Sequence, residues 1–293
     1  MGEQEPGADT IASPMTLEQL REATEGAISF ASEPSGVTWT PAVMGGVAGL
    51  WADSESGDSR RVVQYLHGGG HVAGSAASHR RLGGHLARAI GCRLFLVDYS
   101  RAPEAAHPAS LDDSMAVYRA MLDAGVASDC FAIAGDSAGG GLALSTLLRA
   151  RDEGQPQPAA GFTLSAWTDL EALGSSMDTN AGSDRLLTAS MLRILAAMFL
   201  AGENPRNPLA APVHGDYRGI CPLYLQVGEA EILLDDSNRV AVAARGSGVD
   251  VTLDICPGMQ HVFQLRAGRL AEADQAIDRI AKWLRPRLGL VGT

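Results

Sequence analysis

Lysine is almost absent from this chain: Lys282, near the C-terminus, is the only one. Phosphate-loop nucleotide hydrolases, Ser-x-x-Lys acyl enzymes and most Schiff-base enzymes need a lysine inside a motif. Because Lys282 lies in no such motif, the sequence argues against all three classes.

Cysteine is scarce as well, and its spacing is informative. The four cysteines lie far apart, and no C-x-x-C pair is present. This spacing argues against a zinc site or a redox pair, and we expect neither a metal nor a cofactor. Each cysteine lies at or near an apolar run, so we expect buried, reduced thiols at Cys92, Cys130, Cys221 and Cys256.

Basic charge and long apolar runs are also in short supply. Acidic residues outnumber basic ones 34 to 23, for a formal net charge of -11, which disfavours nucleic acid or an anionic membrane as the main partner. The longest gapless apolar stretch without glycine, 194–201, is too short to span a bilayer. The first thirty residues are acidic and contain no apolar signal core. We therefore expect a cytoplasmic protein without a membrane span.

Apolar runs and helical patterns alternate along the chain. A helical spacing over 15–30 and a hairpin of 37–43 and 47–51 come first. Short apolar runs then predict strands at 62–66, 94–97, 131–134, 161–164, 223–227 and 251–255. Helical patterns separate most of them, at 80–90, 111–122, 140–151, 236–245 and 270–284. Continuous apolar strands linked by helices predict a mostly parallel sheet that is covered on both faces.

One segment interrupts this alternation. Roughly fifty-five residues lie between the strand that ends near Ser165 and the one that begins at Leu223. They include an apolar helical pattern from Leu187 to Phe199. An insertion of this length is typical of a lid or a binding module, although an ordinary core helix is compatible with the same pattern.

The motif Gly135-Asp136-Ser137-Ala138-Gly139 lies between a predicted strand and a predicted helix. A nucleophile elbow needs this context, because a serine on so sharp a turn has strained backbone angles and requires small neighbours two residues away. Gly135 and Gly139 meet that requirement. The following helix directs its positive end at the site where negative charge develops. We therefore predict that Ser137 is a nucleophile.

A second motif, His67-Gly68-Gly69-Gly70, follows the strand at 62–66. Consecutive glycines let backbone N–H groups turn toward a ligand, as an oxyanion hole requires. A glycine run early in the chain and an elbow later is the combination found in lipases and esterases of the α/β-hydrolase fold.

Two other interpretations of the glycine loop are weaker. His67 and His71 are four residues apart, but the intervening glycines argue against a metal-binding helix. The spacing Gly68-x-Gly70-x-x-Ala73 fits a dinucleotide fingerprint, with Asp98 as its acid. That acid is somewhat far downstream, and a dinucleotide site leaves the elbow unexplained.

A serine nucleophile needs a base and an acid that orients the base, in the order serine, acid, histidine for this fold. Only His214 and His261 follow Ser137 in the chain. His261 comes just after the last apolar strand, where open sheets place their ligands. His214 lies in an irregular segment and is expected at the surface, so we predict that His261 is the base.

The acid should follow the strand at 223–227, where the candidates are Glu229, Glu231, Asp235 and Asp236. Asp235 and Asp236 fit the start of the next helix, where an N-cap role is the simpler expectation. Spacing alone does not separate Glu229 from Glu231.

From about Val62 to Phe263 the sequence resembles the hormone-sensitive-lipase-like family of α/β-hydrolases, which includes microbial carboxylesterases and related lactone hydrolases. The family's H-G-G-G matches 67–70, its G-D-S-A-G-G matches 135–140, its D-Y-R-L-A-P-E resembles 98–104, its W-x-D-L matches 167–170, and its G-M-x-H-x-F matches 258–263. The resemblance implies an α/β-hydrolase fold, with a mostly parallel central sheet, flanking helices and a helical cap. Arg101 departs from the leucine usual in the family, and Ala166 from a common proline.

The resemblance also implies site residues. The family's D-P-L-x-D-E segment, whose first aspartate is the triad acid, matches this chain with Glu231 in that place, thirty residues before His261. Glu229 and Asp235 remain the alternatives. By the same analogy, the oxyanion donors are the backbone N–H groups of Gly69, Gly70 and Ala138.

The family further implies a cap made by the N-terminal helix and the insertion around 174–201. Its apolar side chains, among them Met15, Leu17, Met191 and Met198, suit a greasy acyl or alcohol group. The expected division is an N-terminal cap helix and first strand over 1–45, a catalytic domain over 46–172 and 203–293, and a cap insertion over 173–202.

We therefore expect a serine carboxylesterase that hydrolyses short- to medium-chain acyl esters through an acyl-enzyme, with lactones as further candidates. The alternatives are an amidase or formamidase on the same triad and a non-catalytic small-molecule receptor on the same fold. The expected partner is a small-molecule ester, and a homodimer is left open.

Overall fold

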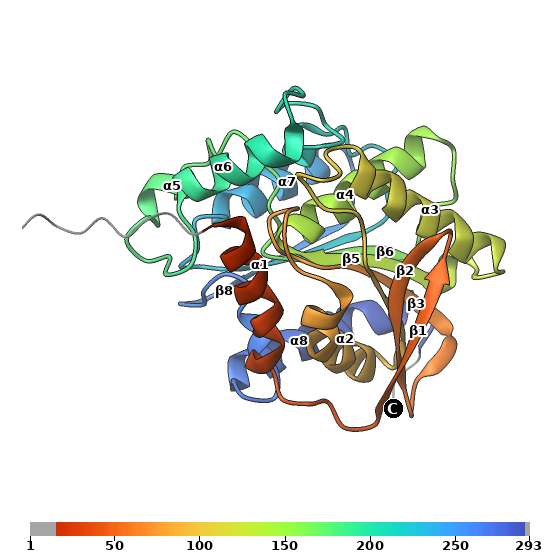
Figure 1. Cartoon of the computed structure of the whole chain (residues 1–293). Helices are drawn as coiled ribbons and strands as arrows, with labels where there is room; N and C mark the ends of the chain where they lie inside the picture. Colours follow the sequence, from red (N-terminus) through yellow and green to blue (C-terminus); the bar gives the residue numbers. More distant parts are fainter. Residues whose placement is uncertain (1–15, 291–293) are drawn as a thin grey trace, which may run out of the picture.

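The computed structural model describes residues 16–290, and its centre is an eight-stranded sheet with the order β1-β2-β4-β3-β5-β6-β7-β8 (Figure 1). The strands are β1 (Val37–Met44), β2 (Val47–Ser54), β3 (Asp58–Leu66), β4 (Cys92–Val97), β5 (Phe131–Asp136), β6 (Ala160–Leu164), β7 (Leu223–Gly228) and β8 (Val251–Cys256). The β1–β2 and β2–β4 pairs are antiparallel, and the other pairs are parallel. The mostly parallel sheet expected from the sequence is confirmed.

Helices cover both faces of this sheet (Figure 1). One face packs against α2 (Ala76–Ile90) and α8 (Ala271–Arg287), and the other against α3 (Ala109–Asp123), α4 (Ser137–Asp152) and α7 (Leu234–Gly246). Successive strand residues alternate between the two apolar cores: Val62 lies in the α4 core and Val63 in the α2 core. This two-sided burial explains why the strands are continuous apolar runs in the sequence.

The predicted elements agree with the observed ones except at their ends. The helix expected from residue 80 begins at Ala76, because the Ser75 side chain accepts a hydrogen bond from Ser78 N and caps it. The helix expected over 15–30 is α1 (Leu17–Gly26), followed by a 3-10 turn at Ala27–Phe30. Further 3-10 turns lie at Ser128–Cys130, Pro212–His214 and Phe263–Arg266.

The long segment between β6 and β7 contains α5 (Ser176–Thr179) and α6 (Ala189–Leu200). The buried face of α6, with Leu195 and Phe199, belongs to an apolar cluster that also contains Ala138, directly after the elbow serine. Leu20 of α1 packs against the same cluster. Both α1 and α6 are therefore anchored over the end of the sheet where the strands before the predicted site residues terminate.

The cysteines are all free, and Cys92, Cys221 and Cys256 are buried as expected. Cys130 is partly exposed, so the prediction of a buried thiol is wrong there. The reason is its position in the 3-10 turn that precedes β5, outside the strand itself. Among residues 16–290, no helix combines the length and apolarity that a bilayer crossing demands.

Candidate active site

The elbow at Ser137 has the geometry that its glycines allow. β5 ends at Asp136 and α4 begins at the next residue, so Ser137 occupies the turn itself with a φ of 51°. A side chain rarely adopts this left-handed conformation, which stores strain. A Cβ on Gly139 would collide with the carbonyl oxygen of Leu66, and a Cβ on Gly135 would collide with Gly139. The turn can therefore form only with glycine on both sides.

Three side chains from different loops meet at this turn. The Ser137 hydroxyl donates a hydrogen bond to His261 Nε2 at 2.9 Å, and His261 Nδ1–H donates to Glu231 Oε2 at 2.6 Å. The loops that carry them follow β5, β7 and β8, which are parallel strands of one sheet. Because parallel strands end at the same edge, residues far apart in the sequence come together there.

The carboxylate of Glu231 is fully buried and held by more than the histidine. Its second oxygen, Oε1, accepts hydrogen bonds from Ser165 Oγ at 2.7 Å and from Gly228 N–H at 2.6 Å. Ser165 Oγ in turn accepts from Val262 N–H at 3.1 Å, the residue after His261. This network fixes the glutamate, one methylene longer than an aspartate, in register with the imidazole.

The Glu231 carboxylate changes the proton affinity of His261. Burial opposes a positive charge on the ring, but the charge of Glu231 and its hydrogen bond outweigh burial and raise the pKa of His261 above 6.5. Asp184 and Asp136 act in the same direction. The site therefore stabilises the protonated form of the ring, the imidazolium.

Geometry separates the candidate acids that spacing left together. Glu229 is exposed, and its carboxylate accepts a hydrogen bond from Gly258 N–H at 2.9 Å. Asp235 accepts from Ser175 N–H at 2.8 Å. Within the described chain, Glu231 is the candidate whose carboxylate hydrogen-bonds to His261.

The N-cap role expected for Asp235 and Asp236 is wrong. α7 begins at Leu234, so both aspartates lie in its first turn instead of at the cap. Asp236 is fully buried, and its Oδ2 accepts hydrogen bonds from Thr168 N–H at 2.7 Å and from Asp169 N–H at 2.8 Å. Asp236 therefore holds the loop after β6.

The glycine loop after β3 presents free backbone donors to the same place. Gly69 and Gly70 have φ values of 121° and 63°, which turn their amides as few other residues could, and both line a cavity with Ser137. Across residues 16–290, neither N–H donates to a protein acceptor. Ala138 lies in the first turn of α4, where amides have no intrahelical acceptor. These amides can bind a negatively charged oxygen.

The two histidines of this loop serve as packing groups. His67 stacks on Tyr99 with ring centroids 4.2 Å apart, and His71 stacks on Phe199 at 3.8 Å. Burial lowers the pKa of each ring to about 3, so both are neutral. Asp98, the acid of the dinucleotide interpretation, accepts a hydrogen bond from Ala76 N–H at the start of α2.

A cavity of about 180 Å³ lies over Ser137. Its walls are mostly apolar and come from α1, the segment between β6 and β7 and the loop after His261: Leu20, Leu187, Met191, Leu195, Val262 and Leu265. Of the predicted cap contacts, Met191 lines the cavity. Leu17 and Met198 instead pack against the apolar cluster that contains Phe199 and Ala138, Met198 because it lies about 10 Å further along α6 than Met191. Met15 lies outside the described residues.

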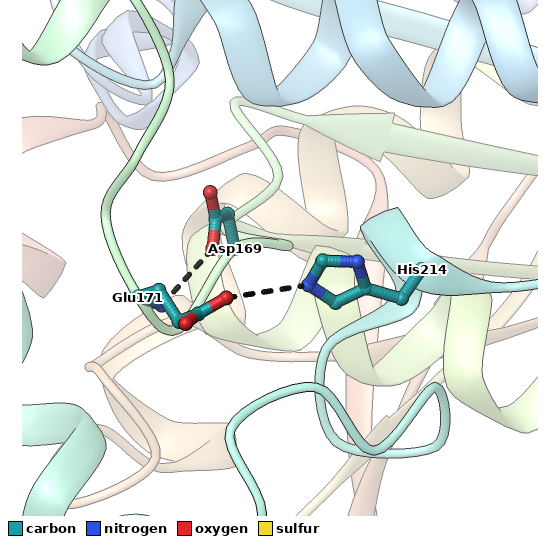
Figure 2. A group of neighbouring side chains, drawn as sticks. All are labelled: Asp169, Glu171 and His214. Atoms are coloured by element: carbon teal, nitrogen blue, oxygen red, sulfur yellow. Dashed lines mark hydrogen bonds and ion pairs between the residues drawn. The ribbon is translucent and has the colours of Figure 1, made fainter.

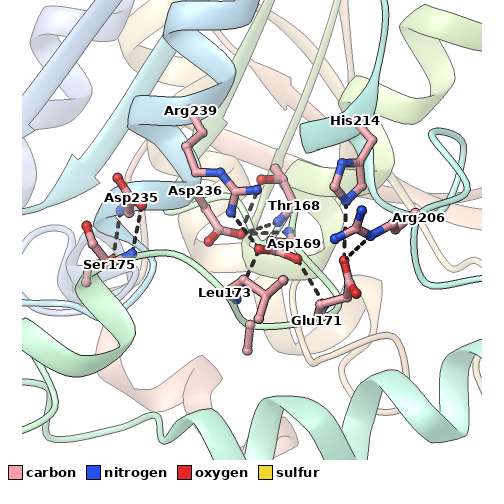
Figure 3. Close-up of polar contacts among 12 residues, drawn as sticks. Thr168, Asp169, Glu171, Leu173, Ser175, Arg206, His214, Asp235, Asp236 and Arg239 are labelled. Carbon is pink, nitrogen blue, oxygen red and sulfur yellow. Dashed lines mark hydrogen bonds and ion pairs between the residues drawn. The ribbon is translucent and has the colours of Figure 1, made fainter.

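One group of side chains has the spacing of metal ligands: Asp169, Glu171 and His214 offer atoms within 4.8 Å of one another (Figure 2). Both carboxylates are already paired with arginines, Asp169 with Arg239 and Glu171 with Arg206 (Figure 3). His214, expected at the surface, has a side chain that is 25% exposed. The group is therefore an ion-pair network that ties the loop after β6 to α7 through Arg239 and to the later loop through Arg206.

Known proteins share the fold of this chain. Residues 63–265 match a family model described as the alpha/beta hydrolase fold. A crystal structure of an esterase from the bacterial hormone-sensitive lipase (HSL) family superposes with a TM-score of 0.92 at 40% identity, over 95% of this chain and 94% of that one. The chain belongs to the hormone-sensitive lipase family of α/β-hydrolases.

Other relatives of this HSL-family protein carry similar descriptions. It is 41% identical to an acetyl-hydrolase of Streptomyces hygroscopicus over 229 residues, 78% of this chain and 77% of that protein. An esterase of Acinetobacter venetianus is 32% identical over 244 residues, covering 83% and 80%. The structure of EstE5 from a crystal soaked with p-nitrophenyl butyrate has a TM-score of 0.91 at 34% identity, covering 96% and 95%. The expected family, fold and activity class, a carboxylic ester hydrolase, are confirmed.

Sequence reasoning missed three side chains of this HSL-family site. Ser165 bridges Glu231 and the His261 loop, and Asp136 pairs with His79 beside Ser137. Ser165 ends a predicted strand at the edge where the site forms, a signal that could have identified it. No sequence spacing indicates His79, because its partner Asp136 lies 57 residues later, in the elbow motif.

Proposed function

We propose that Ser137, His261 and Glu231 are the nucleophile, the base and the orienting acid of this esterase. The amides of Gly69 and Gly70, with that of Ala138, bind the oxyanion. The supporting observation is the unbroken hydrogen-bonded path from Ser137 Oγ through His261 to the buried Glu231 carboxylate. A serine nucleophile needs such a path, because the hydroxyl of a free serine is protonated at neutral pH and is a weak nucleophile without a base beside it.

In this mechanism the Ser137 oxygen attacks the ester carbonyl while its proton passes to His261 Nε2. The carbonyl oxygen becomes negative and accepts hydrogen bonds from the three amides. His261 then gives the proton to the leaving alcohol, and an acyl-serine forms. A water molecule repeats the sequence: it loses a proton to His261, attacks the acyl carbon, and releases the acid as the proton returns to Ser137.

The cavity supports substrates with short acyl chains. Its volume of about 180 Å³ is below the range of about 300–1,000 Å³ typical of drug-sized ligand sites. Apolar walls from Met191 and Leu195 suit an alkyl group and exclude water during reaction. The names of the relatives, an acetyl-hydrolase and an esterase, agree with this substrate class.

The test of the triad is Ser137→Ala, which should lower kcat for p-nitrophenyl acetate by about 10⁴-fold or more. Ser145→Ala provides the matched control, since Ser145 is also buried and lies about two turns further along the same helix. The control should retain wild-type activity. Near wild-type hydrolysis by Ser137→Ala, or absence of a fluorophosphonate adduct at Ser137 in the unaltered enzyme, would exclude this residue as nucleophile.

The substrate class is tested with p-nitrophenyl esters of increasing chain length, a set of lactones and an aryl amide. We expect kcat/KM to be highest for short acyl groups and to fall for long ones, because the cavity lacks room for them. A preference for long chains or for the amide would contradict the proposal. The division into 1–45, 46–172 with 203–293, and 173–202, the cytoplasmic location and a homodimer stay predictions.

A further inference from the structure

A second carboxylate–imidazole pair lies directly beside the nucleophile, and the mechanism above does not use it. Asp136 precedes Ser137, and His79 comes from the first turn of α2. Their side chains are 2% and 3% exposed, and His79 Nε2 lies 3.3 Å from Asp136 Oδ2. Both residues line the same cavity as Ser137.

Asp136 occupies the N-cap position of α4, where an aspartate normally accepts a hydrogen bond from the second or third amide of the helix. The second amide here belongs to Ala138, one of the proposed oxyanion donors. A cap hydrogen bond to the second amide would therefore occupy a donor that the proposed reaction needs. In this structure Asp136 makes no side-chain cap hydrogen bond to the helix.

The carboxylate of Asp136 turns to the glycine loop instead. Its Oδ1 accepts hydrogen bonds from Gly68 N–H at 3.1 Å and from the Tyr65 hydroxyl at 2.9 Å. A Cβ on Gly68 would collide with Asp136 Oδ2, so the loop approaches the carboxylate as only glycine permits. Gly68 immediately precedes Gly69 and Gly70, the two proposed oxyanion donors of this loop. Its hydrogen bond to Asp136 therefore connects the loop to the elbow.

His79 holds the other oxygen of the same carboxylate. Burial opposes a charge on His79, but the Asp136 carboxylate outweighs it and raises the pKa of the ring. Burial likewise disfavours the carboxylate, but His79 and the Tyr65 hydrogen bond lower the pKa of Asp136. Each partner thus favours the charged form of the other, and a charged His79 offsets the negative charge of Asp136 beside the proposed oxyanion site.

We propose that Asp136 is a positioning residue of the oxyanion hole: it ties Gly68 to the elbow, while His79 and Tyr65 keep its carboxylate away from the Ala138 amide. This inference rests on the roles proposed above for Ser137 and the amides. It explains why a helix-capping side chain stands at this position without capping the helix.

The experiment compares Asp136→Ala with Asp136→Asn in p-nitrophenyl acetate hydrolysis. Asp136→Ala should lower kcat about 10²-fold with KM within about threefold of wild type, because the misplaced amides stabilise the transition state more than the bound ester. The kcat of Asp136→Asn should be at least about tenfold higher than that of Asp136→Ala, since the asparagine amide oxygen accepts the same hydrogen bonds. Inhibition by a trifluoromethyl ketone, which forms a tetrahedral adduct, should weaken in parallel with kcat.

Asp236→Ala is the matched control, because Asp236 is an equally buried carboxylate that accepts two backbone N–H groups away from the oxyanion loop. It should lose stability and keep its kcat. His79→Ala is the second variant: it leaves Asp136 in place but removes the partner of its Oδ2, and should lower kcat at least about tenfold. If Asp136→Ala does not fold, the kcat of His79→Ala tests the positioning role in its place.

A folded Asp136→Ala or His79→Ala enzyme with kcat within about threefold of wild type would overturn the inference. So would a loss confined to KM, an equal loss of kcat in Asp236→Ala, or an Asp136→Asn variant as impaired as Asp136→Ala. Ser137→Ala is assayed in the same series. If Ser137→Ala stays active, the proposed triad itself fails, whereas an inactive Ser137→Ala beside a fully active Asp136→Ala removes only the positioning role.

Discussion

Glu231→Gln is the substitution that tests the electrostatic part of the site most directly. It preserves the size of the side chain and removes its charge. In the enzyme the carboxylate accepts hydrogen bonds from His261 on one oxygen and from Ser165 and Gly228 on the other. A glutamine replaces one acceptor oxygen with an NH₂ group, so at least one of these donors loses its partner.

The expected magnitude follows from the separation of the two charges. The Nδ1–Oε2 distance is 2.6 Å, and the centres of the delocalised charges lie about 4 Å apart. At an effective dielectric constant of about 20, that separation corresponds to about 4 kcal/mol of attraction for the imidazolium. Because about 1.4 kcal/mol is a factor of ten in rate, Glu231→Gln should lower kcat about 10³-fold.

The same variant should shift the acid side of the pH profile. In the proposed mechanism His261 must be neutral to take the serine proton, and Glu231 raises the pKa of the ring above 6.5. The wild-type rate should therefore fall as pH drops through that raised pKa. Without the carboxylate the ring protonates only at lower pH, so the acid limb of kcat/KM should move to lower pH while the plateau drops.

The assay is p-nitrophenyl acetate hydrolysis from about pH 5 to about pH 9, with folding verified by circular dichroism. Glu229→Gln is the matched control, since its carboxylate lies two residues away, is exposed and hydrogen-bonds to Gly258. The control should stay within about twofold of wild type. A folded Glu231→Gln enzyme within about tenfold of wild-type kcat, or an acid limb that moves upward, would refute the reasoning.

Three further predictions concern the framework around the site. Gly139→Ala should prevent formation of the active fold, because the added Cβ collides with a carbonyl oxygen at the end of β3, and a soluble variant with full activity would contradict this. Leu195→Ala removes a side chain that is 5% exposed and packs on Gly70, so urea unfolding should show a loss of about 2–5 kcal/mol. Ile194→Ala, at 58% exposure on the same helix, should stay within about 0.5 kcal/mol, and equal losses would argue against the contact. Burial raises the pKa of Asp236 from 3.8 to about 7, so the folded enzyme keeps a proton that the unfolded chain has released, and stability falls as pH rises between these values. The Tm of Asp236→Asn relative to wild type should therefore rise from about pH 5 to about pH 8, and a constant difference would count against this protonation state.

The strands and the elbow were predictable because their signals are local. A run such as 131–134 is apolar at every position because both faces of the sheet are covered, and that requirement is visible in a window of a few residues. Gly135 and Gly139 indicate the elbow by an equally local signal. The collisions that exclude larger residues at these positions arise within the turn and the strand beside it. Element ends were less predictable, as at Ala76, because a single capping hydrogen bond decides them.

The carboxylate partner of His261 and the Asp136–His79 pair beside Ser137 were not predictable in this way. Glu229 and Glu231 are two residues apart in one loop, and only the path of that loop directs one carboxylate to His261 and the other to Gly258. The family motif indicated Glu231, but spacing alone did not. Likewise, an aspartate directly before a helix usually caps it, whereas the Asp136 side chain accepts a hydrogen bond from Gly68 N–H of the glycine loop.

What this sequence determines by itself is therefore the fold class, the turn that exposes Ser137 and the order in which its partners follow along the chain. These depend on short-range sterics and on the period of apolar residues, which each segment carries independently of the others. The tertiary structure alone decides which carboxylate meets His261 and which oxygen of Asp136 faces His79 or the glycine loop. Those choices depend on the direction of each side chain where separate segments converge. A displacement of a side-chain oxygen by about one bond length there is enough to change its hydrogen-bond partner.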